Sequence, residues 1–224
     1  MTTRILFPHT SLVHGAIVIG LALCAAGALA QPPADGIVRY TVLSQNKVAG
    51  QQTVQSMPGG KVKVEYSYRD NGRGPDLFEQ IRLGDTGRAE SIVTTGKSTF
   101  GAPIDESFSR KSGRAAWRSK ADRGEKADAA SALYVPIESS IEMLAISARA
   151  LMRAPGKKLP ALPSGQLAVE RLVEAAVTAG DRSGRVALYA ITGMGTSPSY
   201  VWLWADAAAG DRLFGMVMPA FSVL

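Results

Sequence analysis

The sequence predicts a mainly β fold of the α+β class, in which a curved antiparallel sheet, or a partly open barrel or sandwich, wraps around one amphipathic helix at about 139–153. Three observations predict it. Short segments of alternating apolar and polar residues fill most of the chain on both sides of this helix. Turns that contain glycine separate these segments, as in antiparallel hairpins. The helix has an apolar stripe that it cannot bury alone, so a sheet must cover it.

Residues 1–30 have the pattern of a cleaved export signal. Arg4 is the only charged residue among them, an apolar run follows at 16–23, and residues 28–30 form an A-x-A cleavage site. Cleavage before Gln31 would give a periplasmic or secreted protein without a stable membrane span. An uncleaved membrane anchor is the alternative, but the apolar run is short for a span.

The leader also contains the only cysteine, Cys24, and both histidines, His9 and His14. A lipoprotein signal needs a small residue before the cysteine, and Leu23 stands there, so we expect no lipidation at Cys24. The mature chain would have no His and no Cys, which excludes disulfides, His- or Cys-ligated zinc, and Ser-His-Asp or Cys-His nucleophiles. We therefore expect no bound metal and no cofactor.

After a Pro-rich tether at 31–36, residues 37–224 are expected to form a single β-rich domain. Before the helix, the alternation predicts strands that begin at 37, 48, 61, 77, 89, 104 and 114, with a charged, exposed segment at 121–129 and an extended one at 132–137. The clearest alternation places Val62, Val64, Tyr66 and Tyr68 on the inner face of one strand.

After the helix, the Pro-rich segment 157–165 is expected to cross rigidly to a second group of strands. Residues 167–177 fit either a strand or a helix, and the surrounding strands favour a strand. Further strands are predicted at 185–192, 200–205 and 213–224. The last of these is apolar to the end of the chain, which is typical of a segment that packs against something.

The helix itself is predicted from a stripe at helical spacing, formed by Ile141, Leu144, Ala145, Ala148, Leu151 and Met152. Ser139 and Glu142 match a capping box at its start, and Pro155-Gly156 ends it. Arg149 lies off the stripe, so we expect it on a solvated face.

Two groups of residues are candidates for ligand binding. The glycine-rich loop 69–75 (RDNGRGP) offers Arg69 and Arg73 to an anion, although a plain hairpin-end loop has the same composition. Three tryptophans, Trp117, Trp202 and Trp204, would line a cleft if they did not pack in the core.

Enzymatic and nucleic-acid-binding functions have little support in the sequence. The adjacent carboxylates Asp105 and Glu106 point to opposite faces of a strand and cannot form a dyad with each other. The longest basic run is Lys157-Lys158, so no stripe of charge marks a nucleic-acid surface. Removing Arg4 with the leader lowers the net charge only from +6 to +5.

Several short segments resemble the N-terminal β-rich region of secreted bacterial amidohydrolase-superfamily proteins: 72–75 (GRGP), 108–110 (FSR), 117–118 (WR), 148–151 (ARAL) with 155–156 (PG), and 188–193 (LYAITG). In that family, a metal-dependent catalytic barrel with a His-x-His motif follows this region. The mature chain has no such motif, so the family's hydrolase activity cannot be assigned to any of its residues. The resemblance implies an accessory region standing alone, as a truncation or an independent relative, with its apolar end free for a partner domain.

The leading interpretation is therefore a non-catalytic exported β-domain that accompanies an amidohydrolase through packing or substrate access. The alternative is a free-standing periplasmic carrier for a small apolar or anionic ligand. An enzyme that uses carboxylates alone is the third class. A filled interior would favour the accessory module, and a pocket would favour the carrier.

Overall fold

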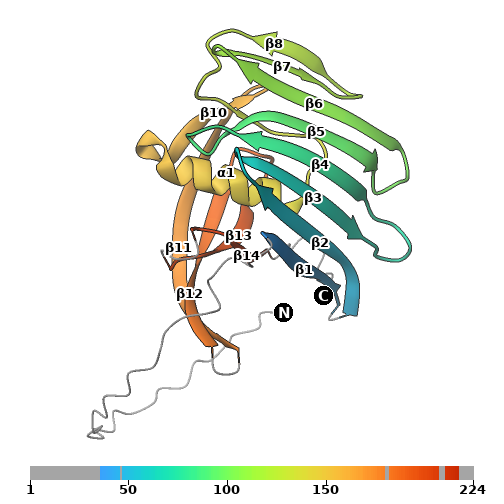
Figure 1. The fold of residues 1–224 in the computed structure, drawn as a ribbon, viewed down its shortest axis with the longest axis vertical. Helices are drawn as coiled ribbons and strands as arrows, with labels where there is room; N and C mark the ends of the chain where they lie inside the picture. The colour runs from blue at the N-terminus through green and yellow to red at the C-terminus, as the bar shows by residue number, and fades with distance from the viewer. Residues whose placement is uncertain (1–35, 46, 180–181, 207–209, 217–224) are drawn as a thin grey trace, which may run out of the picture.

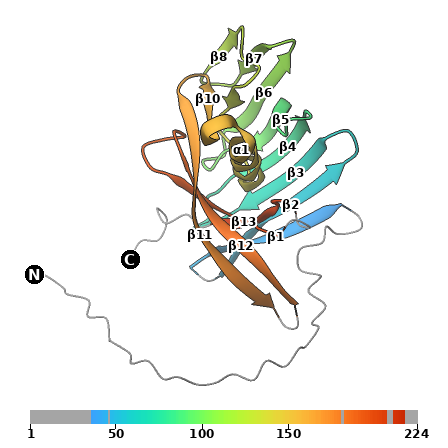
Figure 2. The same cartoon turned by 90° about the vertical axis from the view of Figure 1, so that its left-hand side faces the viewer.

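The computed structural model of the chain describes residues 36–45, 47–179, 182–206 and 210–216. Within these ranges the chain forms two sheets and one α-helix, and α1 (Ile141–Arg153) lies between the sheets (Figures 1 and 2). The predicted β-rich fold around a single helix is therefore confirmed. The predicted leader and residues 31–35 lie outside the described residues.

Sheet A contains eight strands that follow one another in chain order, each antiparallel to its neighbour. These strands are β1 (Ile37–Ser44), β2 (Lys47–Met57), β3 (Lys61–Tyr68), β4 (Asp76–Leu83), β5 (Ala89–Lys97), β6 (Pro103–Lys111), β7 (Arg114–Arg118) and β8 (Arg123–Lys126). Short turns make this meander possible because antiparallel strands need only a few connecting residues. The segment 121–129, which we expected to be charged and exposed, contributes the largely exposed strand β8 to the sheet.

Sheet B contains six strands in the order β14-β13-β12-β11-β10-β9. They are β9 (Leu133–Tyr134), β10 (Lys158–Leu162), β11 (Gln166–Ala179), β12 (Arg182–Thr192), β13 (Ser199–Trp204) and β14 (Leu213–Met216). β9 and β10 are parallel, and the other neighbours are antiparallel. The ambiguous segment 167–177 is strand, and the expected crossing at 157–165 contains β10 after the short 3-10 turn η1 (Pro155–Lys157). Residues 217–224 of the predicted last strand lie outside the described residues.

α1 is buried on two sides rather than one. Leu144, Ala148 and Leu151 pack in a cluster with side chains of sheet B. Met143 and Ile146 pack in a second cluster with side chains of sheet A. The predicted stripe accounts for the first side only, and nearly the whole helix is covered because it lies between two sheets. No helix in the described ranges is long and apolar enough to cross a membrane.

The start of α1 is held by side chains of sheet A. The N-cap residue is Ser140 and no side chain of the helix caps it, so the predicted capping box of Ser139 and Glu142 is wrong. Instead, Glu79 accepts hydrogen bonds from the Ser140 hydroxyl and from the Ser140 N–H, the latter at 2.9 Å. The Gln52 Oε1 atom accepts the Glu142 N–H at 3.2 Å. These bonds satisfy donors that the first turn of a helix leaves unpaired.

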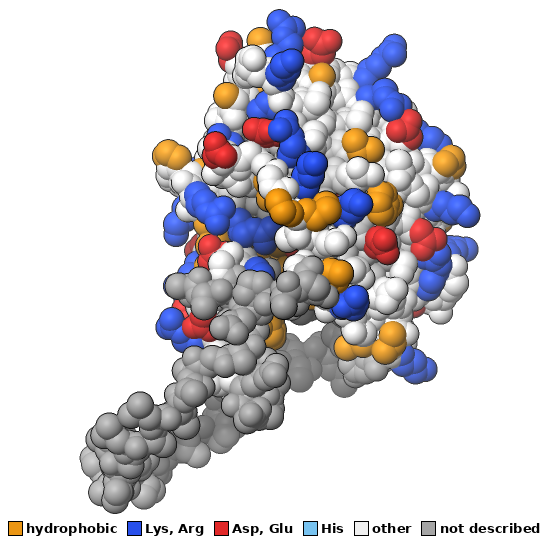
Figure 3. Space-filling view, in the orientation of Figure 1, with side chains coloured by type: hydrophobic (Ala, Val, Ile, Leu, Met, Phe, Trp, Pro, Cys, Tyr) orange, Lys and Arg blue, Asp and Glu red, His pale blue; other side chains and the backbone are white. Residues whose placement is uncertain are grey.

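Arg149 is not on a solvated face, and that expectation is wrong. Its guanidinium lies 2.7 Å from the Glu142 carboxylate, and only 14% of the Arg149 side chain and 8% of the Glu142 side chain are exposed. Most other ion pairs of the described residues lie at the surface, where Figure 3 shows basic and acidic side chains interspersed on the face in view.

Candidate binding groove

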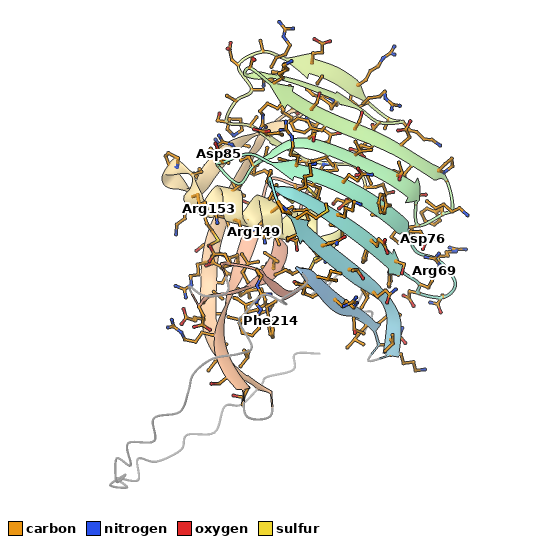
Figure 4. All side chains as sticks on the ribbon, in the orientation of Figure 1. Arg69, Asp76, Asp85, Arg149, Arg153 and Phe214 are labelled. Atoms are coloured by element: carbon orange, nitrogen blue, oxygen red, sulfur yellow. The ribbon has the colours of Figure 1, made fainter. Side chains whose placement is uncertain are left out.

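β1 is an edge strand of sheet A and β14 is an edge strand of sheet B. The two strands lie close together in space although they are the first and the last strand of the described chain. The Tyr40 hydroxyl donates a hydrogen bond to the Leu213 carbonyl at 2.9 Å. Between the two strands is a groove of about 470 Å³, which we call the β1–β14 groove. It is lined by residues 39–45, Gln52, Tyr66, Tyr68, Ile141 and 213–216. Figure 4 labels Phe214 on the β14 side of this groove.

Strand register explains which side chains face the groove. Tyr40 pairs with Gln52, which pairs with Tyr66, so the three lie in one cross-strand row on the inner face of sheet A. The next row along the strands is Val42, Gly50 and Tyr68. Gly50 is required there, because a Cβ atom would lie 2.0 Å from the Ser67 carbonyl oxygen. The backbone of Ser67 and Tyr68 fills the space where a side chain at this position would lie.

The floor of the groove carries an unpaired hydrogen-bond donor. Gln52 is fully buried, and its Oε1 atom is used by the Glu142 N–H. Its Nε2 atom is buried and has no hydrogen-bond partner among the described residues. Buried polar groups are nearly always hydrogen-bonded, so an unpaired amide beneath an open groove points to a bound group.

The described lining of the groove contains few charged side chains. Among the described residues that line it, Arg39 alone is charged, and it is exposed on the opposite face of β1 from Tyr40. Burial, and secondly the nearby Glu142 carboxylate, raise the pKa of the Tyr40 hydroxyl far above its ordinary value. Tyr40 therefore stays neutral and keeps its bond to Leu213 at any physiological pH.

Arg69 and Arg73, the candidates from the glycine-rich loop, lie away from this groove. Arg69 donates to the carbonyls of Tyr68, Gly74 and Pro75 at 2.7, 3.0 and 3.1 Å, and it pairs with Asp76 at 2.5 Å. It therefore holds its own loop in shape at one end of sheet A (Figure 4). The Arg73 guanidinium lies 6.0 Å from the centre of the exposed Phe100 ring, beside a depression of about 500 Å³.

The three tryptophans are not brought together. The Trp117 indole N–H donates to Asp122 at 2.9 Å, and its ring lies 6.4 Å from that of Tyr134, at the β7 end of sheet A. Trp202 and Trp204 lie on the outer face of sheet B, where the Trp204 ring meets Phe214 edge-on at 5.1 Å. The described residues contain no group of three or more His, Cys, Asp or Glu placed to hold a metal ion.

The sequence did not predict the groove, but it predicted the position of some of its lining residues. Tyr66 and Tyr68 were predicted to lie on the inner face of one strand. Gln52 was not singled out from the sequence, and the available signal was an uncharged polar residue at an inward-facing position of β2.

Comparison with known proteins gives little further information. No family model matches the chain, and none of the curated proteins matches it. Among solved structures, a DUF1089 family protein from Pseudomonas aeruginosa is similar, with 14% identity, a TM-score of 0.42, and coverage of 80% of this chain and 94% of that chain. None of this bears on the resemblance to amidohydrolase N-terminal regions, which stays a prediction.

Proposed function

We propose that the chain is a non-catalytic binding module whose β1–β14 groove holds a small ligand. The observation that carries this proposal is the groove itself, which combines a volume of about 470 Å³, aromatic walls and a fully buried amide with a free donor at its floor. Ligand sites in proteins have this size and this combination of apolar walls with a few placed polar groups. The proposal develops the carrier interpretation of the sequence, with the ligand at the open edge because side chains fill the space around α1.

The placement of the buried carboxylates supports a non-catalytic role. Glu79 accepts from Ser140, and Glu106 accepts the Tyr134 hydroxyl at 2.6 Å and the Ile137 N–H at 3.1 Å. Both carboxylates thus hold the segment that leads into α1, and neither lines the β1–β14 groove. Asp105, next to Glu106 in sequence, pairs on the other face with Arg118, which lowers the pKa of the Asp105 carboxyl.

The test is calorimetric titration of the purified protein with two simple amphiphiles, N-methyldecanamide and decanoate. Val42→Trp should fill the groove and abolish binding, because Val42 lies beside Tyr40 on the inner face of β1. Val93→Trp adds the same bulk at an exposed position of β5 outside the groove and is the matched control. Binding of neither probe to the wild type, or equal binding to Val42→Trp, would contradict the proposal.

A second candidate function is the accessory module of an exported amidohydrolase, and the outer face of sheet B favours it. Val173, Leu188 and Trp202 form a cross-strand apolar row there, and Val173 and the nearby Phe214 are 48% and 40% exposed. A catalytic domain packed near β14 would cover such a surface. The test is binding of this chain to a His-x-His barrel protein encoded beside it. Val173→Asp should break the complex, and unchanged binding would contradict the accessory role.

A further inference from the structure

The Gln52 side chain has a fixed orientation that determines what the groove can bind. A glutamine amide has one acceptor end and one donor end, which are distinguished by their hydrogen-bond partners. The Glu142 N–H can only donate, so the Gln52 atom that lies 3.2 Å from it must be Oε1. The other end, Nε2, is therefore a donor, and it is buried without a protein partner. A ligand atom that pairs with it must be an acceptor.

The charges around the floor disfavour an anionic acceptor. Two cations, Arg212 and Arg149, act electrostatically on Tyr40 at the floor. Both already have interactions within the protein, Arg149 with Glu142 at 2.7 Å. The Tyr40 hydroxyl already donates its hydrogen bond to the Leu213 carbonyl. A carboxylate or phosphate at Gln52 would lose its water beside the Glu142 carboxylate and would have to compete with the partners that Arg149 and Arg212 already have, and burial of a charge without its own partner is strongly unfavourable.

The walls above the floor suit an apolar body. Tyr66 is buried, Ile141 and Met216 are half-buried, and Leu43 is exposed along the groove. These side chains would cover the carbon skeleton of a ligand whose polar atom reaches Gln52.

We infer that the β1–β14 groove selects an uncharged molecule with a hydrogen-bond acceptor on an apolar body, the class that includes acyl amides and esters, over the corresponding free acids. The inference rests on the proposed function and narrows it, because the sequence left apolar and anionic ligands equally open. Gln52 is the residue that reads the acceptor.

The experiment compares N-methyldecanamide with decanoate at pH 8, where the acid is ionised. The proteins compared are the wild type, Gln52→Met, which keeps the length of the side chain and removes both the donor and the acceptor of the Glu142 N–H, and Gln51→Met as the exposed neighbouring control. We expect the amide to bind at least about tenfold more tightly than decanoate, and Gln52→Met to weaken the amide about tenfold, as for loss of one hydrogen bond. Gln51→Met should bind both probes as the wild type does.

A second measurement keeps the inference testable if Gln52→Met does not fold. In the wild type, the side-chain amide NMR signal of Gln52 should shift on addition of N-methyldecanamide and stay in place with decanoate. Equal or tighter binding of decanoate, unchanged amide binding by folded Gln52→Met, or an unmoved Gln52 signal would overturn the inference. If one of these results is found but Val42→Trp still abolishes binding of the probes, the selectivity inference is wrong and the proposed function of the groove stands. If the probes bind Val42→Trp as tightly as they bind the wild type, the proposed function itself is contradicted.

Discussion

Replacing Arg149 with alanine tests whether α1 is enclosed by both sheets. Arg149 and Glu142 are seven residues apart on the helix, and their side chains are only 14% and 8% exposed. Removing one partner of a buried ion pair leaves the other charge without compensation, which typically costs about 3–5 kcal/mol. Because Arg149 keeps some contact with solvent, we expect Arg149→Ala to lower the free energy of unfolding by about 3 kcal/mol. This is a large part of the stability of a single domain.

Urea denaturation, followed by circular dichroism, measures this loss. Arg153→Ala is the matched control on the same helix (Figure 4), because its side chain is 53% exposed and lies 3.9 Å from Asp211. It should cost less than about 1 kcal/mol, as exposed pairs do. The double replacement Glu142→Gln with Arg149→Met should recover most of the loss, since it leaves no unpaired charge. A cost below about 1 kcal/mol for Arg149→Ala would refute the burial of this pair.

Three further predictions concern the buried carboxylate, the helix and the leader. Burial raises the pKa of Glu79 from 4.5 to about 7, so the native state keeps a proton that the unfolded state releases. Stability should therefore fall by about 3 kcal/mol as the pH rises from about 4.5 to 7; Glu79→Gln should flatten this profile in urea titrations, and an unchanged slope would contradict it. Leu151→Ala and Ile146→Ala, which face sheet B and sheet A, should each cost about 2–5 kcal/mol in the same assay; a loss below about 1 kcal/mol for either would show that its side of α1 is not packed. Mass spectrometry of the exported protein should find Gln31 as its first residue, and a diacylglycerol-modified Cys24 would disprove cleavage there.

The strands that sequence predicts well are those with one buried and one exposed face. In β3, Val62, Val64 and Tyr66 are buried and alternate with exposed residues, as predicted. The alternation is visible because sheet A packs on one side only. For α1 the same reasoning found one face and missed the other, because a helix between two sheets buries residues such as Ile146 outside the main stripe.

Two strands were missed because their sequences have no alternating apolar pattern. β8 has four residues, three of them charged, and its side chains are largely exposed at the edge of sheet A. β10 contains Pro160 and pairs in parallel with the two-residue strand β9. Both strands form because neighbouring strands offer backbone partners, and a local sequence pattern does not record such partners.

The site was hidden for a related reason. Tyr40 and Leu213 are 173 residues apart, and only the curvature of the two sheets brings β1 and β14 together. Arg69 and Arg73 were candidates because of the composition of their loop. The Arg69 guanidinium, however, donates hydrogen bonds to carbonyls of its own loop and forms an ion pair with Asp76. The tryptophans were expected to line a cleft unless they packed in the core, and each of them packs against an apolar cluster, Trp117 at sheet A and the other two on sheet B.

An NMR titration of the purified protein with N-methyldecanamide tests the central claim most directly. The shifted backbone amides should lie in β1 and β14, around Tyr40–Ser44 and Leu213–Met216, with the Gln52 side chain, because these residues line one groove. Shifts confined to the loop around Arg73, or to the Trp202 face of sheet B, would contradict the claim that the β1–β14 groove is the binding site.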